Sequence, residues 1–205
     1  MPSTVVWADF AQRYALTDLQ IEQFKDYFNL LVSENEQYNL TAITDSDSII
    51  EYHFADSLEL GNKLDFSAIS SICDVGTGAG FPGLALKIKY PHVSVVLIEV
   101  VGKKVSFLNM VISRLGLSGV EVYTQDWRTF LRKTEYPLQL FCARASLRPD
   151  ELTRLFQGGC VYKNAQLVYW AAADWSVGPK EQVFFKKSFE YTVKNRQRKY
   201  ALFSR

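Results

Sequence analysis

A glycine-rich segment, ICDVGTGAGFPG at residues 72–83, is the part of the sequence that points most directly to chemistry. It follows a short apolar run, and four of its twelve residues are glycines. Gly78, Gly80 and Gly83 satisfy the pattern GxGxxG, in which bare backbone and a helix N-terminus approach a bound nucleotide. A tight turn without a ligand is the simpler alternative. Because four glycines exceed what one turn needs, we expect a nucleotide-like ligand here.

Two carboxylates near this segment narrow the choice of ligand. Asp74 lies two residues before Gly76, and its charge suits the cationic amino end of S-adenosylmethionine better than a pyrophosphate, which it would repel. Glu99 closes the next predicted strand, where an acidic side chain can accept hydrogen bonds from ribose hydroxyls. A nicotinamide cofactor also carries ribose, so Glu99 does not discriminate. Asp74 favours S-adenosylmethionine over a nicotinamide-dependent oxidoreductase.

Three polar or aromatic residues follow the third predicted strand, where an adenine would lie if its ribose met Glu99. They are Asp126, Trp127 and Arg128. Trp127 can cover the base, and Asp126 or the nearby backbone can read its amino edge. The alternative for Trp127 is an aromatic side chain of the core.

The loop after the fourth predicted strand, CARAS at residues 142–146, lacks the signatures of several methyl acceptors. No Asn/Asp-Pro-Pro-aromatic turn is present to orient an exocyclic amine. Cys142 has no neighbouring proline, so a structural thiol is favoured over the nucleophile needed for pyrimidine carbon methylation. No lysine follows strand four or five to deprotonate a ribose hydroxyl. Guanine N7 needs none of these groups, only close in-line placement against a methyl donor.

The elements that must position these residues alternate between strand and helix from residue 69 onward. We expect strands at 69–75, 93–98, 120–124, 138–142 and 166–170, helices at 84–89 and 103–115, and a helix opened by Pro149. This order is typical of an α/β fold with a Rossmann-like parallel sheet. Residues 184–193 and 200–204 are β-rich and separated by a basic turn, which predicts a C-terminal antiparallel hairpin.

Helices are expected before the first strand. Thr17 and Gln20 form a capping box, and apolar residues then recur at helical spacing from Ile21. A second helix follows Ser46 or Asp47. The chain is therefore divided into an N-terminal helical cap, residues 1–66, and a main domain, residues 67–205.

Charge and composition limit the partners. The net charge is +1, but residues 1–60 hold eleven acidic and two basic side chains, whereas the last twenty residues hold seven basic side chains and one acidic. The basic end can attract a polyanion, or it can be a solvated edge hairpin. No run is long enough for a membrane helix, and we expect a cytoplasmic protein without membrane contact. Three dispersed cysteines and two histidines predict no metal site.

Five ordered segments carry a resemblance to a known family. They are YNLTAI at 38–43, HFADSL at 53–58, DVGTGAGFPGLALKI at 74–88, LIE followed by GKKVSFL at 97–108, and ARA at 143–145. In this order they resemble the bacterial 16S ribosomal RNA guanine-N7 methyltransferases, also called glucose-inhibited division protein B. The resemblance implies a class I S-adenosylmethionine-dependent methyltransferase that acts on a guanine in the decoding region of 16S rRNA in the small ribosomal subunit.

The resemblance also implies a set of cofactor contacts. These fall on Gly76, Phe81, Trp127, Arg128 and Arg144. Arg144 is the charged group in the loop after strand four, and it is our candidate catalytic residue. It can hold the cofactor carboxylate or a substrate phosphate, and a surface salt bridge is the alternative. His53 and Asp56 match a His-x-x-Asp-Ser motif, and a hydrogen bond between them that locks the cap to the sheet is the favoured interpretation.

The chain departs from the family pattern at two places. Trp127 and Arg128 stand where relatives usually carry an acidic pair, and Ala171 stands where relatives place a lysine in the fifth strand. The basic hairpin can compensate for the missing lysine. These departures keep open an alternative, a noncatalytic RNA-binding module with a vestigial cofactor pocket.

Overall fold

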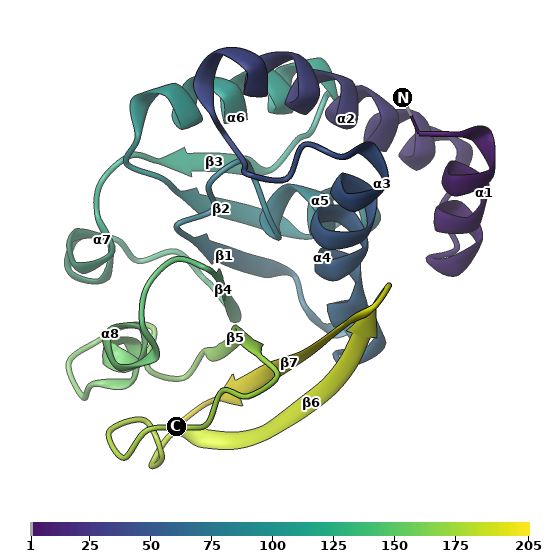
Figure 1. The fold of residues 1–205 in the computed structure, drawn as a ribbon. Helices are drawn as coiled ribbons and strands as arrows, with labels where there is room; N and C mark the ends of the chain where they lie inside the picture. Colours follow the sequence, from purple (N-terminus) through teal and green to yellow (C-terminus); the bar gives the residue numbers. More distant parts are fainter. Residues whose placement is uncertain (1) are drawn as a thin grey trace.

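A single seven-stranded sheet runs through the computed structural model, which describes residues 2–205 (Figure 1). The strand order is β3-β2-β1-β4-β5-β7-β6. The strands are β1 Ser71–Val75, β2 Ser94–Ile98, β3 Val120–Tyr123, β4 Leu140–Arg144, β5 Gln166–Ala172, β6 Phe185–Val193 and β7 Arg196–Phe203. Strands β1 to β5 pair in parallel, and β7 pairs antiparallel with both β5 and β6. The predicted α/β sheet with a C-terminal hairpin is confirmed.

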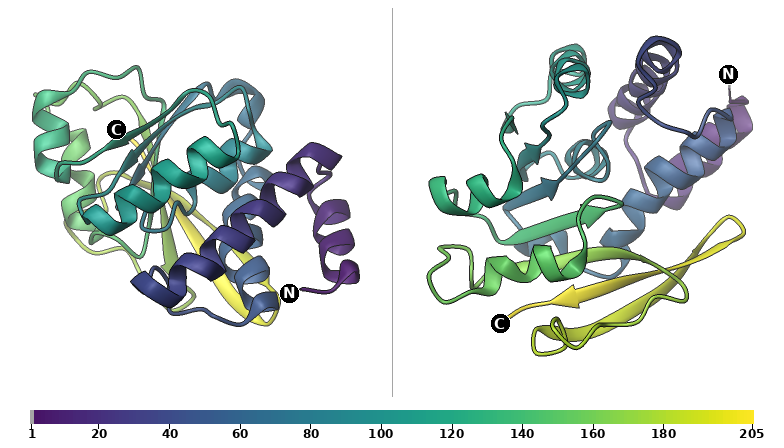
Figure 2. Two further views of the ribbon diagram at one scale, coloured as in Figure 1. Left: turned by 90° about the horizontal axis from the view of Figure 1, so that it is seen from above. Right: turned by 60° about the vertical axis from the view of Figure 1, so that its left-hand side comes forward.

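Helices cover both faces of the sheet, which explains why β1 is buried along its whole length and β4 up to its last residue (Figure 2). One face packs against α5 and α6 together with the cap, and the other packs against α7 and the segment that follows α8. The bounds are α5 Gly83–Lys89, α6 Gly102–Arg114, α7 Trp127–Lys133, α8 Pro149–Leu152 and a 3-10 turn, Thr153–Phe156.

The cap consists of two long helices and a broken third one. Its elements are α1 Thr4–Arg13, α2 Asp18–Tyr38, α3 Ser46–Ile49, a π-helical turn Ile50–Ala55, α4 Asp56–Leu58, and 3-10 turns Glu59–Asn62 and Phe66–Ala68. The capping box of Thr17 and Gln20 is present, and the Gln20 amide also donates to the carbonyls of Ile88 and Lys89 at the end of α5. Cap and sheet share one apolar core, so the boundary at residue 66 stays a prediction.

The hairpin differs from its prediction in where the basic residues lie. Only Lys194 and Asn195 form the turn, and β7 already begins at Arg196. Basic residues predicted for the turn are therefore strand residues, whose side chains alternate between the two faces. The turn lies beside the cap, where the Tyr52 hydroxyl donates to Asn195 Oδ1 at 2.6 Å (Figure 1).

Between residues 2 and 205, every helix is too short or too polar to span a lipid bilayer.

Candidate active site

The glycine loop connects β1 to α5 at the carboxyl edge of the parallel strands. Gly78 has a φ of 64°, and a β-carbon placed on it would meet nothing within 4 Å. At Gly76, by contrast, a β-carbon would lie 2.6 Å from the Ser146 β-carbon, so this glycine lets the loop approach the loop after β4. Of these two glycines, Gly78 is the one with free space where a side chain would stand.

Asp74 lies beneath the loop and is fully buried. Its Oδ2 accepts hydrogen bonds from the Thr77 hydroxyl at 2.6 Å and from the Gly83 amide at 2.7 Å. Its Oδ1 is buried and has no partner within the described residues. Burial raises the pKa of Asp74 to about 6, although both hydrogen bonds oppose the shift. The carboxylate lines neither cavity described below, so its predicted contact with a cofactor stays a prediction.

Glu99 fastens the loop to the next helix. Its Oε2 accepts from the Gly78 amide at 3.0 Å, and its Oε1 accepts from the Val101 amide at 2.9 Å, directly before α6. The side chain is 5% exposed. Each carboxylate oxygen keeps a second lone pair, so Glu99 can still accept a hydrogen bond from a hydroxyl group.

A cavity of about 300 Å³, here called the strand-end cavity, opens where β1, β2 and β4 end. Its lining is Val75, Gly76, Ile98, Glu99, Val100, Lys104, Asp126, Trp127, Ala145, Ser146 and Leu147. Asp126 caps α7 by accepting from the Thr129 amide, and Trp127 donates from its indole to the Glu151 carbonyl. Trp127 is 4% exposed and packs against Phe130 and Phe141, so it is a core aromatic whose edge reaches the cavity.

A second cavity of about 290 Å³, here called the cap-side cavity, lies between the loop, the cap and the hairpin. Its lining is Leu40, Thr41, Ile43, Tyr52, His53, Asp56, Gly76, Thr77, Gly78, Ala79, Phe81, Lys104, Arg144, Ala145 and Arg198. The two cavities share Gly76, Lys104 and Ala145 and therefore meet at the glycine loop.

Arg144 joins the sheet to the cap inside the cap-side cavity. Its guanidinium donates to Asp56 Oδ2 at 3.0 Å and to the Tyr52 carbonyl at 3.2 Å, and it contacts His53 Nδ1 at 3.2 Å. The Arg144 side chain is 14% exposed, so the alternative of a surface salt bridge is wrong. The predicted direct bond from His53 to Asp56 is also wrong, because Arg144 from β4 lies between them.

His53 is held as the neutral ring. An arginine only donates, so His53 Nδ1 accepts from Arg144, and Nε2 then donates to the Thr41 hydroxyl at 2.8 Å. Burial and the charge of Arg144 lower the pKa of His53 to about 3. Phe81 stacks on the His53 ring at 4.7 Å on one side and on Tyr27 at 5.1 Å on the other. Phe81 thus forms a floor of the cap-side cavity.

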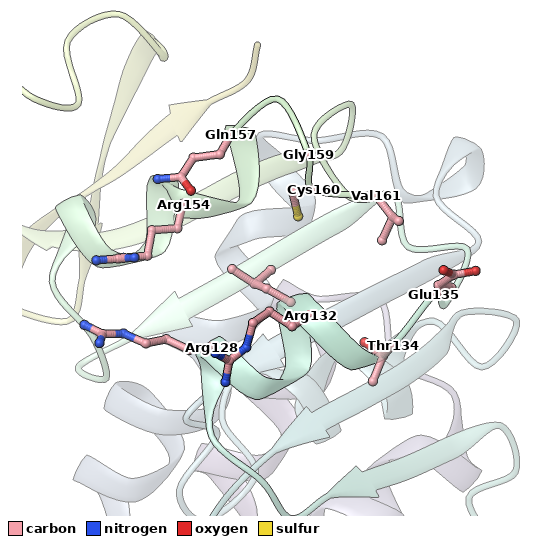
Figure 3. Close-up of a pocket in the computed structure, with 10 residues that line it drawn as sticks. Arg128, Arg132, Thr134, Glu135, Arg154, Gln157, Gly159, Cys160 and Val161 are labelled. Carbon is pink, nitrogen blue, oxygen red and sulfur yellow. The ribbon is translucent and has the colours of Figure 1, made fainter.

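Arg128 takes no part in either cavity. Its exposed guanidinium forms two hydrogen bonds to the Glu151 carboxylate, at 2.7 and 3.0 Å, and Arg154 binds the same carboxylate. Arg128, Arg132 and Arg154 instead line a larger hollow of about 640 Å³ beside α7 (Figure 3). This hollow is away from the glycine loop, and its lining includes none of the residues at the ends of β1 and β2.

Sequence reasoning did not assign three residues to the site, although Arg198 was among the seven basic residues expected to attract a polyanion. Lys104 stands in the first turn of α6 and borders both cavities, and only the basic pair in GKKVSFL gave a signal. Arg198 and Tyr191 come from the hairpin, and Tyr191 donates to Asp56 Oδ1 at 2.7 Å. Nothing local in the sequence connects these hairpin residues to residue 56.

The parallel sheet, the glycine loop after β1 and the acidic residue after β2 define a class I methyltransferase fold. Human methyltransferase 10 domain containing protein superposes on it with a TM-score of 0.60 over 88% of this chain and 96% of that one, at 13% identity. The crystal structure of MtNAS in complex with MTA and tNA gives a TM-score of 0.61 over 91% and 75% of the two chains, at 16% identity. Identities this low show the fold alone.

Within that class, residues 20–198 match the family described as rRNA small subunit methyltransferase G, and the chain belongs to this family. Proteins named ribosomal RNA small subunit methyltransferase G are similar to it. The one from Listeria monocytogenes is 41% identical over 142 residues, which is 68% of this chain and 60% of the relative. The one from Exiguobacterium sibiricum is 46% identical over 109 residues, 53% of this chain and 46% of the relative. The chain thus spans 46% to 60% of the length of these relatives.

Proposed function

We propose that the protein is an S-adenosylmethionine-dependent methyltransferase that modifies N7 of a guanine in the decoding region of 16S rRNA. The observation that carries the proposal is that two cavities meet at the glycine loop, where Gly78 leaves free space beside its α-carbon, within a chain of this family. A noncatalytic module with a vestigial pocket would have no need for a cavity left clear of side chains. The family match likewise does not favour a nicotinamide-dependent oxidoreductase.

The residues at the strand-end cavity fit the adenosyl part of the cofactor. Glu99 has free lone pairs for ribose hydroxyls, and Asp126 and the edge of Trp127 stand where a base would lie. The unpartnered Oδ1 of Asp74 supplies a buried negative charge beneath the loop, suited to a cationic ligand above it. When bound, S-adenosylmethionine supplies a methyl group on a positively charged sulfur, and a nucleophile displaces that sulfur.

The cap-side cavity suits the RNA base. Its lining includes three cations, Lys104, Arg144 and Arg198. His53, the histidine at this cavity, does not have the character of a general base: its ring nitrogens are hydrogen-bonded to Arg144 and Thr41, and its pKa is lowered to about 3. Guanine N7 carries its own lone pair, so the protein would act by orienting the base. In this proposal Arg144 fixes the wall of the cavity and orients the substrate.

Gly78→Ala tests the cofactor half. Gly78 lines the cap-side cavity two residues after Gly76, where the two cavities meet, and we place the methyl-bearing end of the cofactor at this junction. A β-carbon on residue 78 would project toward that end, and we expect calorimetry to show at least tenfold weaker binding of S-adenosylmethionine. Gly116→Ala is a matched control, because Gly116 has a φ of 62°, also has nothing within 4 Å, and lies after α6 away from both cavities. Both variants suffer the same backbone strain. Equal loss in both variants, or no binding by the unmodified protein, would overturn the proposal.

Methyl transfer tests the substrate half. Small subunits from a strain lacking this modification should accept radiolabelled methyl from the purified protein, and mapping of the 16S rRNA should locate one new N7-methylguanine. Methylation at another position or on another atom would contradict the assignment.

A further inference from the structure

Arg198 is a charged side chain at the cap-side cavity whose guanidinium has no partner within residues 2–205. It lies on β7, is partly buried, and forms no ion pair or side-chain hydrogen bond with residues 2–205. Its Nε is buried and unpartnered. A guanidinium left in this state has lost part of its hydration without compensation, which is costly unless a ligand supplies an acceptor.

The neighbouring carboxylate does not supply that acceptor. Asp56 is 2% exposed, and both of its oxygens are engaged: Oδ2 by Arg144 and Oδ1 by the Tyr191 hydroxyl. Other arginines at the edges of the molecule do have carboxylate partners, such as Arg13 with Glu51. Arg198 is thus a cation beside an acid that is already neutralised.

The strand register holds Arg198 in this position. Arg198 pairs with Ala172 of β5 and with Tyr191 of β6. Tyr200, two residues on and therefore on the same face, donates to the Asp56 carbonyl at 3.0 Å. Arg196, two residues before, stacks on the Tyr52 ring at 3.9 Å. The side chains on both sides of Arg198 therefore fasten this face of β7 to the cap.

Lys104 approaches the same cavity from α6. Its ammonium group likewise forms no ion pair or hydrogen bond within the described part of the chain, and the lysine borders both cavities. Two unpaired cations from elements far apart in the sequence thus line a cavity that also contains the open glycine loop. Such a pair can bind an anion that offers more than one acceptor oxygen, such as a phosphate group.

We propose that Arg198, assisted by Lys104, binds a backbone phosphate of the RNA strand that enters the cap-side cavity, and so positions the target nucleotide. This inference rests on the proposed function for the identity of the polyanion. The carboxylate of the cofactor is the competing anion. Two unpaired cations and the basic hairpin around Arg198 favour an RNA backbone, which carries many phosphodiester groups, over a single carboxylate.

Arg198→Gln tests the proposal, with Lys186→Gln as control because Lys186 is an exposed lysine of the same hairpin with no role at the cavity. Binding to unmethylated small subunits should weaken about tenfold in Arg198→Gln and remain unchanged in Lys186→Gln. The slope of log affinity against log salt concentration should fall by about one, as expected for one lost phosphate contact. KM for small subunits should rise while kcat changes little, and Arg198→Lys should recover part of the affinity. Lys104→Gln should act in the same direction.

Three outcomes would overturn the inference: unchanged RNA affinity in Arg198→Gln, an equal loss in the control, or a loss of S-adenosylmethionine affinity without loss of RNA affinity. The last result would assign Arg198 to the cofactor carboxylate. Binding to small subunits is measured without methyl transfer. If RNA affinity depended on Arg198 but the protein transferred no methyl group, the proposed function would be wrong, whereas the role of Arg198 in RNA binding would stand.

Discussion

The two cavities that meet at the glycine loop differ in charge. The strand-end cavity has two carboxylates, Glu99 and Asp126, and shares the lysine Lys104. The cap-side cavity has three cations and one carboxylate, and that carboxylate is already bound by Arg144. Opposite charges on the two sides of one loop suit two different ligands, a cationic small molecule and a polyanion.

The cavities also differ in how they are built. The strand-end cavity is formed by residues close to the ends of consecutive strands, so it depends on local structure in the parallel sheet. The cap-side cavity is assembled from the cap, β4 and the hairpin, and its central ion pair joins residues 56 and 144. Substitutions at the cap-side cavity should therefore change both the stability of the fold and substrate binding. Substitutions at the strand-end cavity should be able to change ligand binding without changing stability.

The largest expected effect comes from Arg144→Ala. This change leaves the buried Asp56 without its cation, and breaking a buried pair in this way costs about 3 kcal/mol of unfolding free energy. Urea unfolding should measure that loss. Arg128→Ala is the control, because the Arg128 ion pair with Glu151 lies in solvent and its removal should change stability little. Similar losses in the two variants would show that the ion pair does not hold the cap to the sheet.

A smaller effect concerns two buried groups whose pH dependences oppose each other. The pKa of Asp74 is raised to about 6, so the folded state binds its proton more tightly, and stability from this group is lost as pH rises from about 4 to 6. The pKa of His53 is lowered to about 3, so stability from this group is present above its ordinary value of 6.5 and is lost as pH falls below that value. Between pH 4 and 6 the two contributions partly cancel.

Single variants should expose each contribution. Relative to the unmodified protein, Asp74→Asn should lose unfolding free energy as pH falls from 6 to 4, and His53→Gln should gain it, each by on the order of 2 kcal/mol. Denaturation at several pH values measures both slopes. Parallel pH profiles for all three proteins would contradict the assigned shifts.

The sequence predicted the strand-end side better than the cap side for a physical reason. The β1 strand, the glycine loop and α5 are contiguous, and Glu99 follows within one βα unit, so their pattern is local. Asp74 lies beneath the loop, where it binds the Thr77 hydroxyl and the Gly83 amide, and its contact with a cofactor stays a prediction. The direction in which the Asp74 side chain leaves the loop cannot be predicted from residue spacing.

On the cap side the errors come from contacts distant in the sequence. Helical spacing predicted a bond between His53 and Asp56, but the cap helix contains a π-helical turn at residues 50–55, and Arg144 enters between the two side chains. Seven basic residues at the C-terminal end, Arg198 among them, were predicted to attract a polyanion, but none was assigned to the site. Arg198 could not be singled out, because its position depends on the register of β7 against β5.

The smallest effect we expect separates the two cavities by ligand. Glu99→Gln replaces one acceptor oxygen with an amide nitrogen facing the donor of either Gly78 or Val101, which loosens the loop and weakens any contact to ribose hydroxyls. Calorimetry should give about tenfold weaker binding of S-adenosylmethionine, or about 1.4 kcal/mol. Affinity for small subunits should stay unchanged, the reverse of the pattern expected for Arg198→Gln.

The control for Glu99→Gln is Glu135→Gln, a glutamate that lines the separate hollow beside α7. It should leave both affinities at their original values. If Glu99→Gln instead weakened RNA binding as much as cofactor binding, the two cavities would act as one site. The proposal that the strand-end cavity binds the cationic cofactor and the cap-side cavity binds RNA would then be wrong, because neither cavity would discriminate a cation from a polyanion.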